Sequence, residues 1–134
     1  MEPLKAHTNS VVHVIFGKDA DLLVSAGLDK AIIVWDLGDK CNPKVRHMIK
    51  THTRYVDRIS LSPDDSFVVS GSAGNLMQMW DVTTGQQVRV VMGISPPVID
   101  SIVWSRDGQR IESVVSEGQM VPVRNVDIKV RVPL

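Results

Sequence analysis

Three residues in the first quarter of the chain are of the types found in a hydrolytic triad: His7, Ser25 and Asp29. A serine hydroxyl becomes nucleophilic when a histidine accepts its proton and a carboxylate orients the histidine ring. The same three residue types also build buried structural networks, so catalysis needs independent support from the site itself. Their place within the repeats described below favours the structural interpretation, and we expect no enzymatic activity.

Two further sets of side chains have metal-binding or redox potential. The four histidines are His7, His13, His47 and His52, and their spacing matches no compact zinc pattern. Cys41 is the sole cysteine and has no neighbouring base in the sequence, which indicates a loop thiol of no special role. We therefore expect no metal and no cofactor.

The overall composition excludes several classes of partner. The 134 residues carry 15 basic and 15 acidic side chains, and this balance disfavours a general nucleic-acid binder and a polybasic membrane patch. The N-terminus does not resemble a signal peptide, and the apolar runs are far shorter than a membrane span. One cysteine allows no intrachain disulfide. We expect an intracellular protein, cytoplasmic or nuclear, without nucleic-acid or membrane partners.

The elements that must position these side chains come from an internal repeat. The stretch from Leu22 to Asp36, LLVSAGLDKAIIVWD, has a weaker copy from Phe67 to Asp81, FVVSGSAGNLMQMWD. Three pairs share one interval: His7 with His52, Ser25 with Ser70, and Trp35 with Trp80. That interval is about 45 residues, and a period of this length ending in Trp-Asp is the signature of propeller blades.

Short runs rich in β-branched residues predict the strands of each repeat, with turn residues between them. The predicted strands are Val11–Phe16, Leu22–Ser25, Ala31–Trp35, Lys44–Lys50, Tyr55–Leu61, Phe67–Gly71, Leu76–Trp80, Gln87–Met92, Ile99–Trp104 and, as a last outer strand, Val126–Val132. The run Ala31–Trp35 is apolar without interruption, which indicates burial on both faces. No segment has the periodicity of a helix of two turns or more.

These residues and their spacing resemble the WD-repeat family. The resemblance implies an all-β fold of WD-type four-stranded antiparallel blades, arranged as a partial, open β-propeller. It implies one domain over residues 1–134, with repeats at about 5–43 and 44–86 and a degenerate repeat at about 87–132.

The family has a hydrogen-bonded chain of His, Ser or Thr, Asp and Trp inside each blade. In the first repeat of this sequence the resemblance places it at His7, Ser25, Asp29 and Trp35. In the second repeat His52, Ser70 and Trp80 match, but Gly74 stands at the Asp position. In the third repeat only Ser113 remains, with Ser95 at the His position and Val123 at the Trp position.

The resemblance also implies a function, as a scaffold or adaptor that binds other proteins. Arg and Tyr are favoured at protein interfaces. The candidate partner-binding residues lie where a loop enters a first strand or at turn tips: Leu28, Thr53, Arg54, Tyr55, Arg58 and Ala73. Two alternatives stay open, a propeller-type enzyme and a truncated piece of a larger WD-repeat protein without independent function.

Three blades are too few to close a ring, because propellers have about four to eight. Each blade packs its apolar faces on its neighbours, so we expect the two end blades to leave one face uncovered each. Exposed apolar area of this kind implies a partner. We expect further WD blades in the same or another copy of the chain, or self-association through the end blades.

Overall fold

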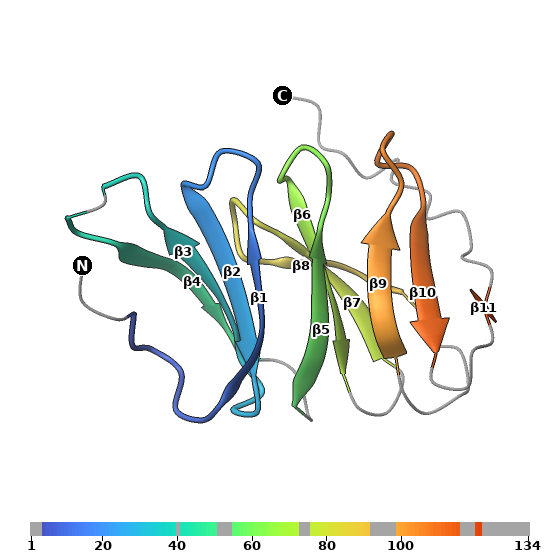
Figure 1. Ribbon diagram of the computed structural model, residues 1–134, viewed down its shortest axis with the longest axis horizontal. Helices are drawn as coiled ribbons and strands as arrows, with labels where there is room; N and C mark the ends of the chain where they lie inside the picture. The colour runs from blue at the N-terminus through green and yellow to red at the C-terminus, as the bar shows by residue number, and fades with distance from the viewer. Residues whose placement is uncertain are drawn as a thin grey trace.

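The computed structural model consists of β-strands in three antiparallel sheets (Figure 1). It describes residues 4–39, 41–50, 55–72, 76–91, 99–115 and 120–121, and none of these is helical. The first sheet has the order β1 (Val11–Phe16), β2 (Leu22–Gly27), β3 (Ile32–Asp36), β4 (Lys44–Ile49), and the second β5 (Val56–Leu61), β6 (Phe67–Ser72), β7 (Leu76–Asp81), β8 (Gln87–Val91). In the third sheet β10 (Ile111–Val115) lies between β9 (Ile99–Trp104) and β11 (Met120–Val121). The all-β blade architecture expected from the repeat is confirmed.

The three sheets stand one beside the next, with their first strands together (Figure 1). β1 packs against β5, and β5 packs against β9, without joining into one hydrogen-bonded sheet. Since the first strands converge while the later strands fan outward, the stack has the geometry of blades around a propeller axis.

The structural period continues through the third sheet, although its sequence has diverged. In the pairing of the first two strands, Phe16 faces Leu23, Leu61 faces Val68 and Trp104 faces Ile111. All three of these pairings contain a register shift at the end where the first strand begins. The turn that follows each first strand has a residue with positive φ at one equivalent place, respectively Ala20, Asp65 and Gly108.

Strand β2 is longer than the sequence indicated. We expected a strand over Leu22–Ser25, but β2 runs to Gly27. Ala26 pairs with His13 on one side and Ile32 on the other, so the ladder continues through these small residues.

Two apolar interfaces join the sheets. Between the first and second sheets, residues of β2 and β3 such as Val24 and Val34 share one core with Ile59 and Trp80. Between the second and third sheets, the core contains Phe67, Val69, Met77 and Met79 together with Ile102, Trp104 and Ile111. Each interface is therefore built from apolar side chains of neighbouring sheets, both aliphatic and aromatic. Removing this apolar area from water stabilises the fold by about 25 cal/mol per Å2.

Strand β3 confirms the expected burial on both faces. Ile32 and Val34 point into the interface with the second sheet, whereas Ile33 and Trp35 point to the opposite face of the first sheet. All four side chains are buried. Alternation of side chains along a strand explains how one run of apolar residues serves two cores.

The expectation that the first sheet leaves its far face uncovered is wrong for most of that face. Leu23, Ile33 and Trp35 are buried there, together with Ala31. The cover comes from Leu4 and Ala6 in the segment before β1, and from Leu37 after β3. The N-terminal segment thus takes the place of a neighbouring sheet over β2 and β3, while apolar side chains of β1 stay exposed.

Polar contacts between described residues tie the first sheet to the second. His13 Nδ1 on β1 accepts a hydrogen bond from the backbone N–H of Ile59 on β5, at 3.0 Å. The backbone N–H of Lys18 donates to Asp65 Oδ2 at 3.0 Å. His47 Nε2 on β4 donates to the carbonyl oxygen of Thr83 at 2.8 Å. The contacts involve the first strands, the turns after them and the outer strand, so they fix the angle between the sheets as well as their distance.

The contact of His13 makes the stability of the two-sheet unit dependent on pH. Burial lowers the pKa of His13, and the neighbouring Arg58 guanidinium lowers it further. A histidine whose pKa is lowered by folding stabilises the fold above its ordinary pKa of about 6.5, and this contribution is lost as pH falls below that value.

We therefore expect unfolding free energy to fall between pH 7 and pH 5, and the His13→Asn variant to show a weaker fall. The Asn side-chain oxygen can accept the same N–H bond without titrating in this range. Denaturant unfolding of both proteins at several pH values measures the difference. Parallel pH profiles for the two proteins would contradict this role for His13.

Candidate functional site

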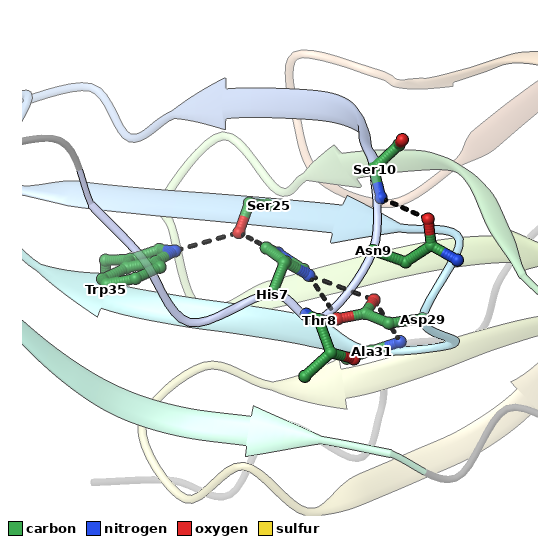
Figure 2. A network of polar contacts seen from close by, with 8 residues as sticks. All are labelled: His7, Thr8, Asn9, Ser10, Ser25, Asp29, Ala31 and Trp35. Atoms are coloured by element: carbon green, nitrogen blue, oxygen red, sulfur yellow. Dashed lines mark hydrogen bonds and ion pairs between the residues drawn. The ribbon is translucent and has the colours of Figure 1, made fainter.

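The triad-like residues of the first repeat meet in one hydrogen-bonded network (Figure 2). His7 comes from the segment before β1, Ser25 from β2, Asp29 from the turn between β2 and β3, and Trp35 from β3. His7 Nδ1 lies 2.9 Å from Asp29 Oδ2, and His7 Nε2 lies 2.6 Å from Ser25 Oγ. Trp35 Nε1 donates to the same Ser25 Oγ at 2.9 Å.

The partners determine which atoms donate. Asp29 accepts from the Nδ1–H of His7, so Nε2 of the neutral ring is left as an acceptor for the hydroxyl of Ser25. The Ser25 oxygen in turn accepts the indole N–H of Trp35. Every polar atom in the series thus has a defined role, and removing one member leaves a buried group unpaired.

The carboxylate of Asp29 is the best-connected member of the network. Besides His7, it accepts hydrogen bonds from the backbone N–H of Thr8 at 3.0 Å and of Ala31 at 3.2 Å. Burial raises the pKa of Asp29, but the bonds from Thr8, His7 and Ala31 outweigh that effect and hold the pKa below its usual range. The carboxylate therefore stays ionised and fastens the segment before β1 to the β2–β3 turn.

Sequence reasoning missed Gly27, which gives the network its room. A Cβ at this position would lie 2.6 Å from the carbonyl oxygen of Ser10, 3.1 Å from Asp29 Oδ1 and 3.3 Å from His7 Nδ1. Such distances are shorter than ordinary van der Waals contact, so any side chain here would displace the residues of the network. The sequence contains one indication of this close contact, the run of small residues that ends β2. That run alone does not show which segment packs against Gly27.

The same geometry argues against catalysis at Ser25. The side chains of His7 and Asp29 are 6% and 5% exposed, and Ser25 as a residue is 4% exposed. A nucleophilic serine must reach a substrate carbonyl, and its oxygen must be free to attack. Here that oxygen is covered and already bonded to Trp35. The arrangement acts as a structural clamp within the first sheet.

The second sheet retains part of this network. Trp80 Nε1 donates to Ser70 Oγ at 2.9 Å, as Trp35 does to Ser25. His52 and Gly74 lie outside the described residues, as do Ser95 and Val123 of the third repeat. Ser113 is in β10, opposite Ile102 and Val121. Trp104 on β9 bonds differently, donating its Nε1–H to the carbonyl oxygen of Ser60 on β5 at 3.3 Å.

The candidate partner-binding residues are only partly within the described structure. Leu28 and Tyr55 are exposed, Leu28 in the β2–β3 turn and Tyr55 directly before β5. Leu28 follows Gly27, which pairs with the first residue of β1, and Tyr55 precedes the first residue of β5. Both positions are therefore at the end of the sheets where the first strands begin. Arg58 is inside β5 and half-buried, so it belongs to the strand rather than to the loop. Thr53, Arg54 and Ala73 lie outside the described residues.

Other types of site find no support in the described part of the chain. Among these residues no three His, Cys, Asp or Glu side chains come together as a metal site would require. Within the same ranges there is no helix of the length and apolarity needed to cross a membrane. Cys41 is exposed, and its backbone N–H bonds to Asp39 in the loop between β3 and β4.

Comparison with known proteins gives a consistent result. The family model "WD domain, G-beta repeat" matches residues 2–36 and 43–81. The Arabidopsis thaliana WD repeat-containing protein WDS homolog is 26% identical over 132 residues, which cover 82% of this chain and 25% of that protein. The Caenorhabditis elegans small ribosomal subunit protein RACK1 is 36% identical over 65% of this chain and 26% of its own length.

Two further matches cover more of the chain. Subunit I of eukaryotic translation initiation factor 3 from Schizosaccharomyces pombe is 27% identical over 98% of this chain and 41% of that protein. A solved structure, that of U3-55K, superimposes with a TM-score of 0.76 at 20% identity, over 91% of this chain and 41% of the other. The chain thus spans roughly a quarter to two fifths of the length of these proteins, and the structural likeness concerns the fold.

The clamp formed by His7, Ser25, Asp29 and Trp35 leads to a stability prediction. Asp29→Ala should lower the free energy of unfolding by about 1–3 kcal/mol, because the His7 ring and two backbone N–H groups lose their buried acceptor. Asp19→Ala, in the exposed turn between β1 and β2, should change it by less than about 0.5 kcal/mol.

The loss in Asp29→Ala should depend on pH in a defined direction. A carboxyl whose pKa is lowered by folding stabilises the protein above its ordinary pKa of about 3.9, and the contribution disappears as pH falls through the folded value. Thermal melts of both variants from pH 7 to pH 3 measure this. Equal melting temperatures for Asp29→Ala and the parent at pH 7 would contradict the clamp.

Proposed function

Because the chain belongs to the WD-repeat family, we propose that it is a protein-binding scaffold or adaptor that catalyses no reaction. The observation that carries this proposal is the placing of Leu28 and Tyr55, two exposed apolar side chains on successive sheets, at one end of the stack. The first and second sheets, which carry these residues, are held in a fixed arrangement by a shared apolar core and by polar contacts between them. Loops fixed by a rigid scaffold are where binding function resides in such folds.

The partners in this proposal are other proteins, and the setting is intracellular. Support comes from the relatives, two of which are named as a small ribosomal subunit protein and as a subunit of a translation initiation factor, that is, as components of assemblies. Loop residues Thr53, Arg54 and Ala73 join the proposed surface by their sequence positions beside Tyr55 and the β6–β7 turn. Arg58 takes a lesser part, since it is half-buried.

A second candidate is that these 134 residues form one part of a larger propeller. Support comes from coverage, because the chain spans 25%, 26% and 41% of three relatives. In this proposal the binding surface is completed by blades beyond the three repeats at about 5–43, 44–86 and 87–132, and a closed ring needs at least about one more blade.

The binding surface is tested with a matched pair of variants. Leu28→Ser/Tyr55→Ser removes the two exposed side chains at the proposed surface. Val45→Ser/Met48→Ser removes two comparably exposed side chains from β4, on the outer strand. Each protein is immobilised and the proteins that it retains from a cell extract are quantified by mass spectrometry.

The proposal expects the first variant to lose specific partners by about tenfold or more, as truncation of an interface anchor does. The β4 variant should retain them. Equal retention by the parent and by Leu28→Ser/Tyr55→Ser would rule out this end of the sheets as the binding surface.

The absence of catalysis has its own test. A serine-reactive fluorophosphonate should leave Ser25 unmodified in the folded protein, because its oxygen is buried and bonded to Trp35 and His7. Intact-mass spectrometry after incubation gives the readout. Stoichiometric labelling that maps to Ser25 would favour an enzyme over a scaffold.

A further inference from the structure

Asn9 has a side-chain conformation from which an asparagine can react with its own main chain. Its side-chain oxygen Oδ1 accepts a hydrogen bond from the backbone N–H of Ser10 at 2.8 Å (Figure 2). The side chain is therefore folded toward the peptide bond that follows it, and the Ser10 nitrogen lies next to the amide carbon Cγ, to which Oδ1 is bonded. Both residues are exposed, so water and hydroxide reach these atoms.

The reaction open to this pair is closure of a succinimide ring. The Ser10 nitrogen loses its proton to hydroxide and forms a bond to Cγ of Asn9, and the bond from Cγ to Nδ2 then breaks. The leaving nitrogen takes a proton from water and departs as ammonia. Water opens the ring at either carbonyl and so yields aspartate or isoaspartate, in which the main chain runs through Cγ. All atoms come from the chain and from water, and nothing is oxidised or reduced.

The residue that follows Asn9 distinguishes it from the other asparagines of the sequence. A bulky side chain on the attacking residue hinders ring closure, whereas Ser10 is small. Asn42 precedes a proline, whose nitrogen carries no proton that could be lost. Asn75 and Asn125 precede a leucine and a valine, both of which are larger than serine. The sequence and the side-chain conformation thus indicate the same site.

Ring closure at Asn9 breaks no bond of the strand ladder. Ser10 lies directly before β1, and its N–H donates to the Asn9 side chain. This hydrogen bond keeps the attacking nitrogen beside the amide and is lost when the nitrogen gives up its proton. Because the two reacting groups are already held together, less entropy is lost on the way to the ring.

The isoaspartate product lengthens the main chain at a place where both neighbours are fixed. The N–H of Thr8 donates to Asp29 Oδ2 at 3.0 Å, and the carbonyl oxygen of Ser10 accepts from the N–H of Leu28 at 2.9 Å. The same carbonyl oxygen approaches Gly27 so closely that a Cβ there would lie 2.6 Å from it. An additional main-chain atom between Thr8 and Ser10 therefore displaces at least one of these contacts.

From these observations we propose that Asn9 is a site of spontaneous covalent modification, at which attack by the Ser10 nitrogen produces aspartate and isoaspartate. The isoaspartate form weakens the attachment of the segment before β1 to Asp29. Leu28 belongs to the proposed partner-binding surface, so the modification also alters that surface. This last consequence rests on the proposed function, whereas the reaction and its effect on the fold do not.

Ageing of the 134-residue chain in neutral buffer tests the reaction. Trypsin releases the peptide of residues 6–18, which contains Asn9. Liquid chromatography with mass spectrometry quantifies its forms against synthetic standards that carry asparagine, aspartate or isoaspartate at this position. The free synthetic peptide, aged in parallel, gives the rate of conversion without the fold.

We expect both products at Asn9, at no less than about a third of the rate in the free peptide, because the fold already holds the reacting groups together. Isoaspartate is the specific marker of ring closure, since direct hydrolysis of the amide yields aspartate alone. Ser10→Val should slow the conversion by at least about tenfold, because its β-branched side chain crowds the nitrogen. A rate below that third, aspartate without isoaspartate, or faster conversion at Asn125 would overturn the proposal.

The effect on the fold has a separate readout. The isoaspartate fraction of the aged parent should melt at least about 5 °C below the fresh protein, whereas aged Ser10→Val should keep its melting temperature. Asn9→Asp adds the charge without lengthening the main chain and should lower the melting temperature by less than about 2 °C.

Two results of these melts would contradict the effect on the fold. The first is an isoaspartate fraction that melts together with the fresh protein, and the second is an Asn9→Asp variant that melts as low as that fraction. Failure of the binding test with Leu28→Ser/Tyr55→Ser leaves all of these readouts unchanged, since none of them measures a partner.

Discussion

The structure depends on one constraint, the need to cover both faces of the inner strands. Ile32 and Val34 of β3 point one way and Ile33 and Trp35 the other, and all four are buried. A single sheet cannot satisfy this, so each sheet requires a layer on either side. The second sheet obtains both layers within the chain, from the first and the third. The first sheet obtains one from the second sheet and most of the other from Leu4, Ala6 and Leu37.

The polar network of the first sheet serves this same packing. Asp29 binds His7 and the backbone of Thr8, and so holds the N-terminal segment where Leu4 and Ala6 can cover Trp35. Ser25 satisfies the indole N–H of Trp35, which would otherwise be buried without an acceptor. His7, Ser25 and Asp29 are of the types that form hydrolytic triads, but here they hold the N-terminal segment over the apolar face of the first sheet.

Much of this could be predicted from the sequence. The β-branched runs located strands β1 to β9 within a residue or two, whereas β10 and β11 were not predicted, and the predicted strand Val126–Val132 lies outside the described residues. The common interval of the His, Ser and Trp residues identified the blade repeat before any contact was known. Turn chemistry also persisted where the Trp was lost: Ser105 Oγ caps the N–H of Arg110 as Ser62 Oγ caps that of Phe67. Local patterns of this kind can be recognised in a sequence, because each is determined by residues that are close to one another along the chain.

Contacts between sheets could not be predicted in the same way. The bond from Ile59 N–H to His13, the approach of Ser10 to Gly27 and the cover supplied by Leu4 join segments whose proximity arises only after the sheets stack. The exposure of apolar side chains on β1 could not be predicted either, because the sequence of this segment is typical of an ordinary β-strand. Val14 and Phe16 are exposed there, whereas Ile59 on β5 and Ile102 and Trp104 on β9 are buried.

Native-state hydrogen exchange of the backbone amides tests most directly whether shared burial holds the sheets together. The account predicts that the amides of β3 and β7 exchange slowly and with one common free energy of opening, because the two strands contribute to the same inter-sheet core, while exposed β4 exchanges faster. If β3 and β7 instead open with clearly different free energies, or if β3 exchanges as fast as β4, the sheets are independent units and the account is wrong.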